Sequence, residues 1–450
     1  MGVFKTYDIR GIYGEEITAE LAYRLGRALA RHTKAKTCVA GYDARLHSAE
    51  LYRRLLQGLA DEGVKATGLG LTSTPQLHYY QIHECYALGV MVTASHNPPQ
   101  YHGFKVYDDA GGSISYAKGL DKIEKLVAGR LDDAAVPGGS VTEMKRLDEY
   151  IDFVCSPLAG RKEKLALKAV IDPGNGSSGH VFRALIEKLG LDAVIIHEEP
   201  DGRFPNRSPN PLQPESRAKL TAAVLETGAD FGAGLDGDGD RLLFVDEQGE
   251  ALENYFVGAL ISEELLTEQP GSAIVYDLIS SRVLPERIAE LQGRPVTAKV
   301  GYTFLYDEMI ASGAVFGCET SGHVYFRVSD SFYTESAAYA LVLILKLLSK
   351  TKKPLSELAA PLKRRYVQLP EWNVEVQDKA KVMAAVEARF AASAGAEIDK
   401  LDGVSVSTKE VWFNIRPSNT EPLLRIRLEA VDAEAAAACR SEIAALLEEV

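Results

Sequence analysis

Tyr86–Pro98 reads YALGVMVTASHNP, an apolar run that ends in a short polar loop. The run favours a buried β-strand, and Asn97 and Pro98 mark its end because both residue types are typical of turns. Ser95 therefore follows the carboxyl end of a predicted strand, where open α/β sheets place their ligands. Serine is also common in turns without any function, so the interpretation of Ser95 depends on the rest of the chain.

The same order of elements recurs along the chain. Three stretches alternate predicted strands with predicted helices, beginning at strands 37–42, 168–172 and 272–276. This alternation is typical of parallel sheets that are covered by helices. Each stretch ends in a polar loop, so we expect these loops to line one cleft between domains.

The pattern changes after the basic stretch Pro361–Arg365. A smaller α+β domain is predicted there by a helix near 378–392 and short strands near 404, 411–415 and 423–428. We therefore predict an α/β protein with three consecutive mixed or parallel α/β sandwich domains and a smaller C-terminal α+β domain around a central cleft. The predicted domain boundaries are residues 1–148, 149–249, 250–364 and 365–450.

Charge and composition exclude several classes of partner. The 450-residue chain has a net charge of -13, and it lacks the basic stripes that bind polyanions, so we expect no nucleic-acid partner and no membrane partner. The longest apolar stretch, Ala337–Leu345, is about half of what a bilayer span requires and favours a buried helix. The five cysteines lie far apart without a CxxC pair, which predicts a cytoplasmic location.

A second unusual string, Asp236–Arg241, reads DGDGDR and follows the predicted strand 230–235. Alternate carboxylates on a strand stand roughly 7 Å apart, but intervening glycines let the backbone curl until all three converge on one cation. Hard carboxylate oxygens favour Mg²⁺. The rival interpretation is an acidic turn. An EF-hand is excluded because Arg241 stands where that loop requires glycine.

Together, the serine and aspartate loops predict a phosphorylated Ser95 beside a divalent metal ion. Such a serine would carry close to two negative charges at neutral pH, so the site requires cations. Arg10, Lys105 and Arg241 are the candidates, because each of them has a glycine nearby in the sequence.

Two other residues near the serine loop have weaker assignments. His96 follows Ser95 directly, and we expect adjacent side chains to diverge, which disfavours a hydrolase dyad. Arg45, in the string Gly41–Arg45, is expected to fix the loop of the first domain by a salt bridge.

Two later loops suit a sugar phosphate. Arg416 combines a forked guanidinium with the short hydroxyl and amide donors of the residues after it, which suits phosphate. The carboxylate of Glu319 is flanked by small polar residues and suits sugar hydroxyls. His323 by itself is as consistent with a structural role as with a contact to a ligand. The phosphate loop offers Arg416, Ser418, Asn419 and Thr420, and the sugar loop offers Glu319, Ser321 and His323.

These strings, in this order, resemble the α-D-phosphohexomutase superfamily, and most closely its bacterial phosphomannomutase/phosphoglucomutase group. The resemblance covers essentially the whole chain, and five motifs at family-like intervals are far more specific than any one of them. The motifs are Tyr7–Gly11, Thr93–Tyr101, Asp236–Arg241, Glu319–His323 and Arg416–Pro422.

The resemblance implies that Ser95 passes a phosphoryl group to a hexose 1- or 6-phosphate. The resulting hexose 1,6-bisphosphate, which would also act as activator, reorients and returns its other phosphoryl group to the serine. The implied metal is one Mg²⁺ per chain, held by Ser95, Asp236, Asp238 and Asp240. Together with the charge argument above, we expect the catalytic residues to be Ser95, Arg10, Lys105, Arg241 and His96. The expected substrate-binding residues are Tyr7, Lys299, Glu319, Ser321, His323, Arg416, Ser418, Asn419 and Thr420, of which the resemblance itself implies Glu319, Ser321 and the residues from Arg416 to Thr420.

Two positions depart from the pattern of this group. A lysine that usually follows a strand of the third domain is Ile279 here, and a histidine that usually follows a glycine is Tyr302. Lys299 would compensate only in part for the lost phosphate contacts. For the base that takes the hydroxyl proton, Lys105 is the first candidate because it is close to the serine loop, and His323 is the second.

Mannose phosphates are the expected substrates, with glucose phosphates also accepted, because contacts from Glu319 and Ser321 to hydroxyls distant from C2 would not sense the epimer. The expected assembly is a monomer or a homodimer. Phosphoglucosamine mutase is the alternative within the superfamily. A metal-dependent sugar phosphatase, with water as acceptor, and a catalytically silent sugar-phosphate sensor, favoured by Ile279 and Tyr302, are the alternatives outside it.

Overall fold

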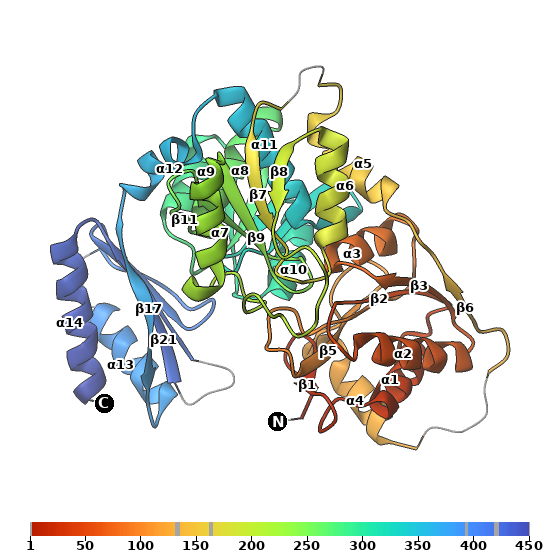
Figure 1. Ribbon diagram of the computed structural model, residues 1–450. Coiled ribbons are helices and arrows are strands. Elements are labelled where there is room, and N and C mark those ends of the chain that lie inside the picture. Colours follow the sequence, from red (N-terminus) through yellow and green to blue (C-terminus); the bar gives the residue numbers. More distant parts are fainter. Residues whose placement is uncertain (1, 131–135, 162–164, 392–394, 418–422, 450) are drawn as a thin grey trace.

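Apolar strands alternate with amphipathic helices along most of the chain and build four sheets in chain order (Figure 1). The computed structural model describes residues 2–130, 136–161, 165–391, 395–417 and 423–449. The first three sheets are mixed and the fourth is antiparallel. The predicted fold class, three α/β units followed by a smaller α+β unit, is therefore confirmed.

The first sheet is covered on both faces. In β2, Val39 packs with the core beside α3, whereas its neighbours Cys38 and Ala40 pack beside α1 and α2, as strand alternation requires. Its strands, in spatial order, are β1 (Ile9–Ile12), β5 (Tyr101–Tyr107), β4 (Gly89–Val92), β2 (Thr37–Tyr42), β3 (Lys65–Leu71) and β6 (Ser140–Glu143). Its helices are α1 (Ala19–Thr33), α2 (Ser48–Asp61), α3 (Thr74–His83) and α4 (Leu120–Ala128), and α5 (Asp148–Cys155) leads to the second sheet.

Close packing of α1 against α2 depends on two glycines. A β-carbon at Gly58 would lie 2.1 Å from the Tyr23 carbonyl oxygen, and one at Gly26 would lie 2.3 Å from the Leu55 carbonyl oxygen. Any larger residue would therefore push the two helices apart. This contact fixes α1 and α2 on the face of the sheet that lies away from the second domain.

The second sheet presents the acidic string as a turn. Strands β9 and β10 are antiparallel, and Leu235 pairs with Leu242, so Asp236–Arg241 forms the loop between two buried strands. The strands, in spatial order, are β11 (Ala251–Leu252), β10 (Leu242–Asp246), β9 (Phe231–Leu235), β7 (Lys168–Asp172) and β8 (Asp192–Ile195). The helices of this unit are α6 (Gly179–Leu189) and α7 (Pro214–Thr227).

The third sheet shares a continuous apolar core with the first two. The predicted buried helix is α11 (Ala337–Thr351), which lies inside this core. In the described part of the chain, no helix has the length and apolar character to cross a membrane. The strands, in spatial order, are β13 (Arg294–Ala298), β12 (Ala273–Asp277), β14 (Phe316–Cys318), β15 (Val324–Ser329) and β16 (Phe332–Glu335). The other helices are α8 (Asn254–Glu268), α9 (Val283–Glu290), α10 (Tyr302–Ser312) and α12 (Leu355–Lys363).

The fourth sheet has a core of its own, built around Phe390, Phe413 and Ile443. It stands to one side of the other three units (Figure 1). Arg282 links it to the third unit through a 3.0 Å ion pair with Glu429. The strands, in spatial order, are β17 (Val367–Glu375), β21 (Leu423–Ala430), β20 (Val411–Pro417), β19 (Val404–Ser407) and β18 (Glu397–Asp399), with α13 (Lys379–Ala391) and α14 (Ala433–Glu449).

His78 makes hydrogen bonds to both the first and the third unit, and these bonds define which of its ring nitrogens carries the proton. Its ring is fully buried, and its Nδ1 atom accepts from the backbone N–H of Glu335 at 3.4 Å. Its Nε2 atom must therefore carry the proton that is donated to the Gly111 carbonyl at 2.8 Å. Burial lowers the pKa of His78 to about 4, below its ordinary value of 6.5.

We predict that His78 makes folding stability depend on pH. Because its folded-state pKa is depressed, its contribution is complete above pH 6.5 and is lost as the pH falls towards 4. Between these two pH values, the free energy of unfolding should fall by about 1.4 kcal/mol for each pH unit. Urea unfolding should show that His78→Gln costs more stability at pH 7 than at pH 5. His83→Gln, at an exposed position of the same helix, is the control. An equal cost of His78→Gln at both pH values would contradict the prediction.

Candidate active site

Ser95 and Asp236 meet although they are 141 residues apart in the chain. The Ser95 hydroxyl donates a hydrogen bond of 2.8 Å to Asp236 Oδ2. Ser95 has a φ of 51°, a left-handed conformation that costs a non-glycine residue about 1 kcal/mol or more. A β-carbon at Gly237 would lie 2.7 Å from the Ser95 carbonyl oxygen, so glycine is needed for the two loops to approach.

The aspartate loop closes around one of its own carboxylates. Asp236 Oδ1 accepts from the backbone N–H groups of Gly239, Asp240 and Arg241 at 3.0, 3.1 and 3.2 Å. Gly239 has a φ of 75°, which allows this turn. The predicted role of the glycines, to let the backbone curl, therefore agrees with the observed geometry.

The three aspartates form a set of ligands for a hard cation. All three are fully buried, and one oxygen from each lies within 4.8 Å of the others. Asp238 Oδ1 and Asp240 Oδ1 have no hydrogen-bond partner among the described residues. Burial first, and then Asp240 and Asp238, raise the pKa of Asp236 well above its ordinary value. Buried, partly unpaired carboxylate oxygens at this spacing fit a divalent ion with oxygen ligands.

Lys105, on β5, supplies positive charge to this cluster. Its Nζ atom donates to Asp238 Oδ2 at 2.8 Å and also to Asp240 Oδ2. Burial alone would lower the pKa of Lys105, but the Asp238 and Asp240 carboxylates outweigh it and hold the pKa well above its ordinary value. Thr74, at the start of α3, donates to Asp238 Oδ2 at 2.6 Å. Lys105 is thus a fixed cation, which makes it a poor base.

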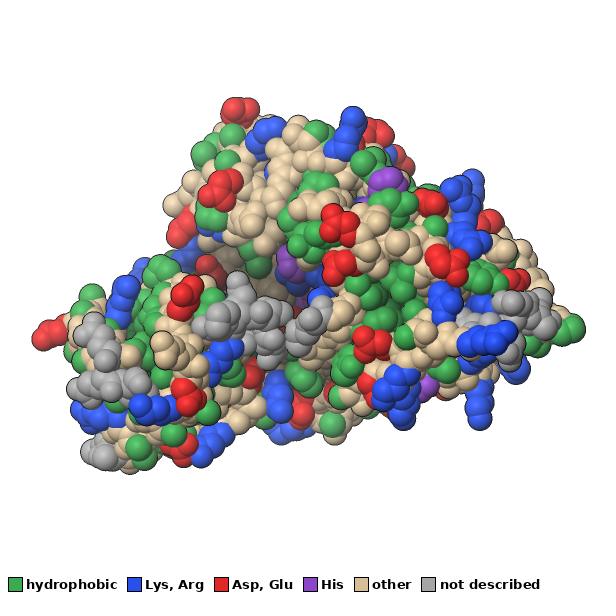
Figure 2. All heavy atoms as spheres, turned by 90° about the horizontal axis from the view of Figure 1, so that it is seen from below, with side chains coloured by type: hydrophobic (Ala, Val, Ile, Leu, Met, Phe, Trp, Pro, Cys, Tyr) green, Lys and Arg blue, Asp and Glu red, His purple; other side chains and the backbone are tan. Residues whose placement is uncertain are grey.

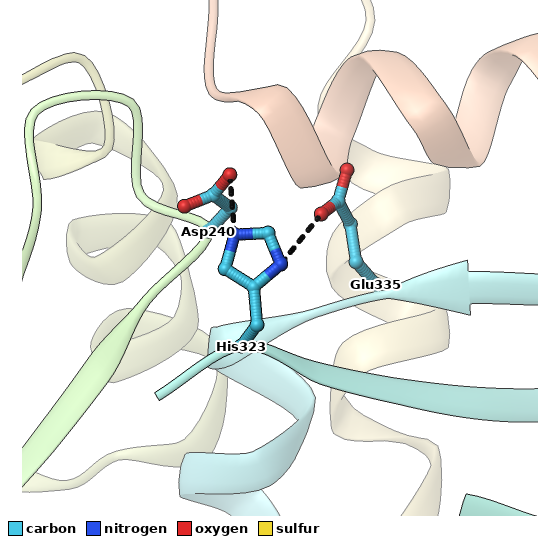
Figure 3. A group of neighbouring side chains, drawn as sticks. All are labelled: Asp240, His323 and Glu335. Atoms are coloured by element: carbon cyan, nitrogen blue, oxygen red, sulfur yellow. Dashed lines mark ion pairs between the residues drawn. The ribbon is translucent and has the colours of Figure 1, made fainter. Parts of the chain in front are cut away.

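His323 lies between two acidic side chains from different units (Figure 3). Its Nε2 atom is 2.8 Å from Asp240 Oδ2, and its Nδ1 atom is 3.7 Å from Glu335 Oε2. Glu335, at the end of β16, also accepts a 3.1 Å hydrogen bond from Tyr107. Burial, with Asp240 as the next cause, raises the pKa of Glu335 to about 7. The sequence did not single out Glu335, because it lies in an ordinary strand pattern without a glycine or a turn.

The remaining cations and His96 surround the serine. Arg10 pairs with Asp8 at 2.7 Å and donates to Asn97 Oδ1, in the serine loop, at 2.8 Å. Arg241 Nε is buried without a hydrogen-bond partner among the described residues. The expected divergence of His96 from Ser95 is wrong, because the left-handed turn brings His96 Nδ1 to 3.2 Å from Ser95 Oγ. Burial, and then Arg241, lower the pKa of His96 well below its ordinary value, so its ring is neutral.

Two buried arginines, Arg45 and Arg207, donate hydrogen bonds to the backbone of the serine loop and of the strand that leads into the aspartate loop. The predicted salt bridge of Arg45 is present, at 3.1 Å to Asp43. Arg207 pairs with Asp172 at 2.7 Å and donates to the Leu235 carbonyl, directly before the aspartate loop, at 2.6 Å. Arg45 also donates, at 2.5 to 2.9 Å, to the carbonyl groups of Ser95, Asn97, Pro98 and Tyr101.

Ser321 of the predicted sugar loop and Arg416 of the predicted phosphate loop line one cavity of about 580 Å³, together with Ile279. Glu319 accepts from Ser321 Oγ and from the Gly301 backbone N–H, both at 2.9 Å. Ser418, Asn419 and Thr420 lie outside the described residues. Figure 2 shows a hollow between the fourth unit, at left, and the rest of the chain, with histidine and basic side chains on its wall.

The side chains of Tyr7 and Tyr302 join the first and third units, and the centre of the Tyr302 ring lies 5.4 Å from that of His323. The Tyr7 hydroxyl donates to the Val300 carbonyl at 3.2 Å, and the Tyr302 hydroxyl donates to the Tyr7 carbonyl at 3.3 Å. The centre of the Tyr302 ring lies 5.8 Å from Lys105 Nζ, so the ring covers the lysine. Lys299 is exposed and lies over the Phe304 ring at 5.8 Å.

Comparison with known proteins agrees with this arrangement. Four models of the phosphoglucomutase/phosphomannomutase family match the chain: alpha/beta/alpha domains I, II and III at residues 1–132, 148–249 and 253–366, and the C-terminal domain at 371–446.

Similar proteins with a curated description include two phosphomannomutases. The one from Salmonella montevideo is 37% identical over 95% of this chain and 94% of its own length. The one from Methanocaldococcus jannaschii is 36% identical over 96% of this chain and 94% of its own length. A crystal structure of a phosphoglucomutase/phosphomannomutase family protein from Burkholderia thailandensis superposes with a TM-score of 0.89, at 30% identity, over 99% of this chain and 97% of that one. The chain therefore belongs to the phosphoglucomutase/phosphomannomutase family.

Proposed function

We propose that the protein is a phosphohexomutase that moves a phosphoryl group reversibly between O6 and O1 of a hexose phosphate. The observation that carries this proposal is the 2.8 Å contact between the Ser95 hydroxyl and the buried aspartate loop. A serine carrying a phosphoryl group at this position would lie beside a cation site and a row of fixed positive charges. The similarity to proteins described as phosphomannomutases supports the same activity.

Ser95, Asp236, Asp238 and Asp240 would hold one Mg²⁺, as their buried and partly unpaired oxygens suggest. When bound, the ion neutralises negative charge on the transferring phosphoryl group. Phosphoryl transfer depends mainly on position and charge, so the side chains around the serine have two tasks: to hold it in line with the acceptor and to offset charge.

Lys105, Arg10 and Arg241 offset that charge. Lys105 is locked between Asp238 and Asp240, and Arg10 is tied to the serine loop through Asn97, so neither cation has to reorganise during the reaction. Preorganised charge in a buried site stabilises a transition state more than mobile charge does. Arg241 keeps a buried Nε–H without a partner among the described residues, which leaves it free to donate to a phosphoryl oxygen.

His96 is the base that this geometry favours. Its neutral ring places Nδ1 at 3.2 Å from Ser95 Oγ, so rotation of the hydroxyl away from Asp236 would bring the hydroxyl proton within reach of this nitrogen. When the phosphoryl group passes from Ser95 to a sugar hydroxyl, the sugar oxygen loses a proton and the serine oxygen gains one, and the return transfer reverses both changes. His96 would relay this proton: the neutral ring takes it from the hydroxyl that accepts the phosphoryl group and then, as imidazolium, gives it to the oxygen that releases the group, whereas Lys105 is held protonated by two carboxylates.

The substrate would occupy the cavity that Arg416 and Ser321 line. Arg416 would hold the phosphate that does not react, and Glu319 and Ser321 would bind sugar hydroxyls. After the first transfer, the hexose 1,6-bisphosphate would turn end for end and return its other phosphoryl group. Added hexose 1,6-bisphosphate would rephosphorylate Ser95 and so act as an activator. We expect a cytoplasmic monomer or homodimer.

The first test is the mass of the intact protein. We predict an increment of one phosphate that is absent from Ser95→Ala and is lost on incubation with excess hexose monophosphate. The same variant should lose isomerase activity by about 10³-fold or more, since the step then lacks its nucleophile. Ser178→Ala, whose hydroxyl has no partner among the described residues, is the matched control. Release of free phosphate in step with substrate loss would support a phosphatase instead.

Metal removal should also lower the unfolding temperature of the protein. Without a cation, three buried carboxylates repel one another, so Mg²⁺ should raise the unfolding temperature of protein treated with a chelator. Asp238→Asn should abolish most of that rise and lower activity. Asp330→Asn, at an exposed position, should leave the rise intact. An equal rise in Asp238→Asn and the wild type would contradict the metal site.

The sugar specificity can be measured directly. We predict turnover of both mannose 1-phosphate and glucose 1-phosphate, because Glu319 and Ser321 are expected to contact hydroxyls distant from C2. The comparison of kcat/KM for the two substrates, with glucosamine 1-phosphate as a third, is the test. A difference in kcat/KM above about a thousandfold, which corresponds to roughly 4 kcal/mol, would show that another contact distinguishes the two sugars at C2.

A further inference from the structure

Glu371 lies against the arginines of the proposed phosphate site. Its Oε2 atom is 3.1 Å from Arg416 Nη2, and its Oε1 atom is 3.7 Å from Arg425 Nη1. Arg416 and Arg425 are direct partners across the β20–β21 pair, so their guanidinium groups start from adjacent backbone positions. One carboxylate thus shares its two oxygens between two cations, an arrangement similar to the way two arginines bind a phosphate.

A β-bulge places Glu371 beside Arg416 and Arg425. The register of β17 against β21 shifts between Leu369 and Trp372, so Pro370 and Glu371 together lie opposite one residue of β21, and β17 carries one extra residue there. A bulge re-aims the side chain that it carries, and proline cannot continue the ladder. Glu371 lines the same cavity of about 580 Å³ as Arg416 and Ser321. The irregularity therefore turns a carboxylate towards the place where an anionic substrate would bind.

The pair differs from the structural arginine pairs of this protein. Arg45 with Asp43, and Arg207 with Asp172, have side chains that are at most 2% exposed. The Glu371 side chain is 29% exposed, whereas that of Arg416 is 11% exposed. Moving Glu371 into water therefore costs little, while Arg416 stays in place. Arg416 also keeps a buried Nη1 atom without a partner among the described residues, so Glu371 does not satisfy the guanidinium fully.

We propose that Glu371 is a built-in counter-anion, which occupies Arg416 and Arg425 until the phosphate group of the substrate displaces it. It would lower the affinity for hexose phosphate, because the ligand must break an ion pair before it forms its own. This inference rests on the proposed function, in which Arg416 holds the non-reacting phosphate. It adds that the affinity of that site is set by competition within the chain.

Glu371→Gln tests the proposal, because glutamine keeps the shape of the side chain and removes its charge. Titration calorimetry with inorganic phosphate as the probe should show a Kd about fivefold lower than in the wild type, the size of one exposed ion pair. The KM for hexose phosphate should fall by a similar factor, while kcat does not rise. Glu375→Gln removes the same charge from an exposed position of the same strand and should leave both values unchanged.

The variant Arg416→Gln tests whether the gain in phosphate affinity depends on Arg416. In an Arg416→Gln background, Glu371→Gln should raise the phosphate affinity by much less than it does in the wild type, because the nearer of the two cations that Glu371 covers is no longer present. A weaker or unchanged affinity in Glu371→Gln alone would overturn the proposal, since it would make Glu371 a brace that orients Arg416 or a bystander. If the wild type fails to isomerise hexose phosphates, the proposed function fails. If it isomerises them and Glu371→Gln binds phosphate no tighter, this inference alone fails.

Discussion

Burial of three carboxylates at one point is the constraint on which the rest of the structure depends. Asp236, Asp238 and Asp240 are fully buried with oxygens within 4.8 Å of one another, and such a concentration of negative charge is unstable without positive charge around it. Lys105, from the first unit, is inserted between Asp238 and Asp240, and His323, from the third unit, lies 2.8 Å from Asp240. The need for charge balance therefore ties three units to one loop.

Rigidity at this point comes from hydrogen bonds to the backbone. Ser95 is held in a left-handed conformation that the surrounding structure must over-determine, and Arg45 does so through the carbonyl groups of the serine loop. Arg207 holds the carbonyl before the aspartate loop in the same way. Both arginines are buried and paired with a buried aspartate, so their own charge is satisfied while their remaining donors fix the two loops.

The fourth unit has a core that is separate from the continuous core of the other units, and the ion pair between Arg282 and Glu429 is one of the contacts across the boundary. The bulge in β17 turns Glu371 towards Arg416 at this boundary, beside the cavity that Ser321 also lines. The serine loop is thus held by fixed hydrogen bonds, whereas the proposed phosphate contact of Arg416 would depend on an ion pair that a ligand can replace.

The sequence by itself determined the alternation of strands and helices, the α+β character of the last unit, the buried helix at α11 and the three polar loops of the site. Those features depend on hydrophobic period, glycine placement and turn residues, which are local properties of the chain. The contact of His96 with Ser95, the inclusion of Thr74 and Glu335, and the carbonyl clamp of Arg45 were decided only by the tertiary structure. Each depends on a backbone twist or on the packing of residues far apart in the chain, and no local pattern in one sequence records which distant side chain will fill a given position.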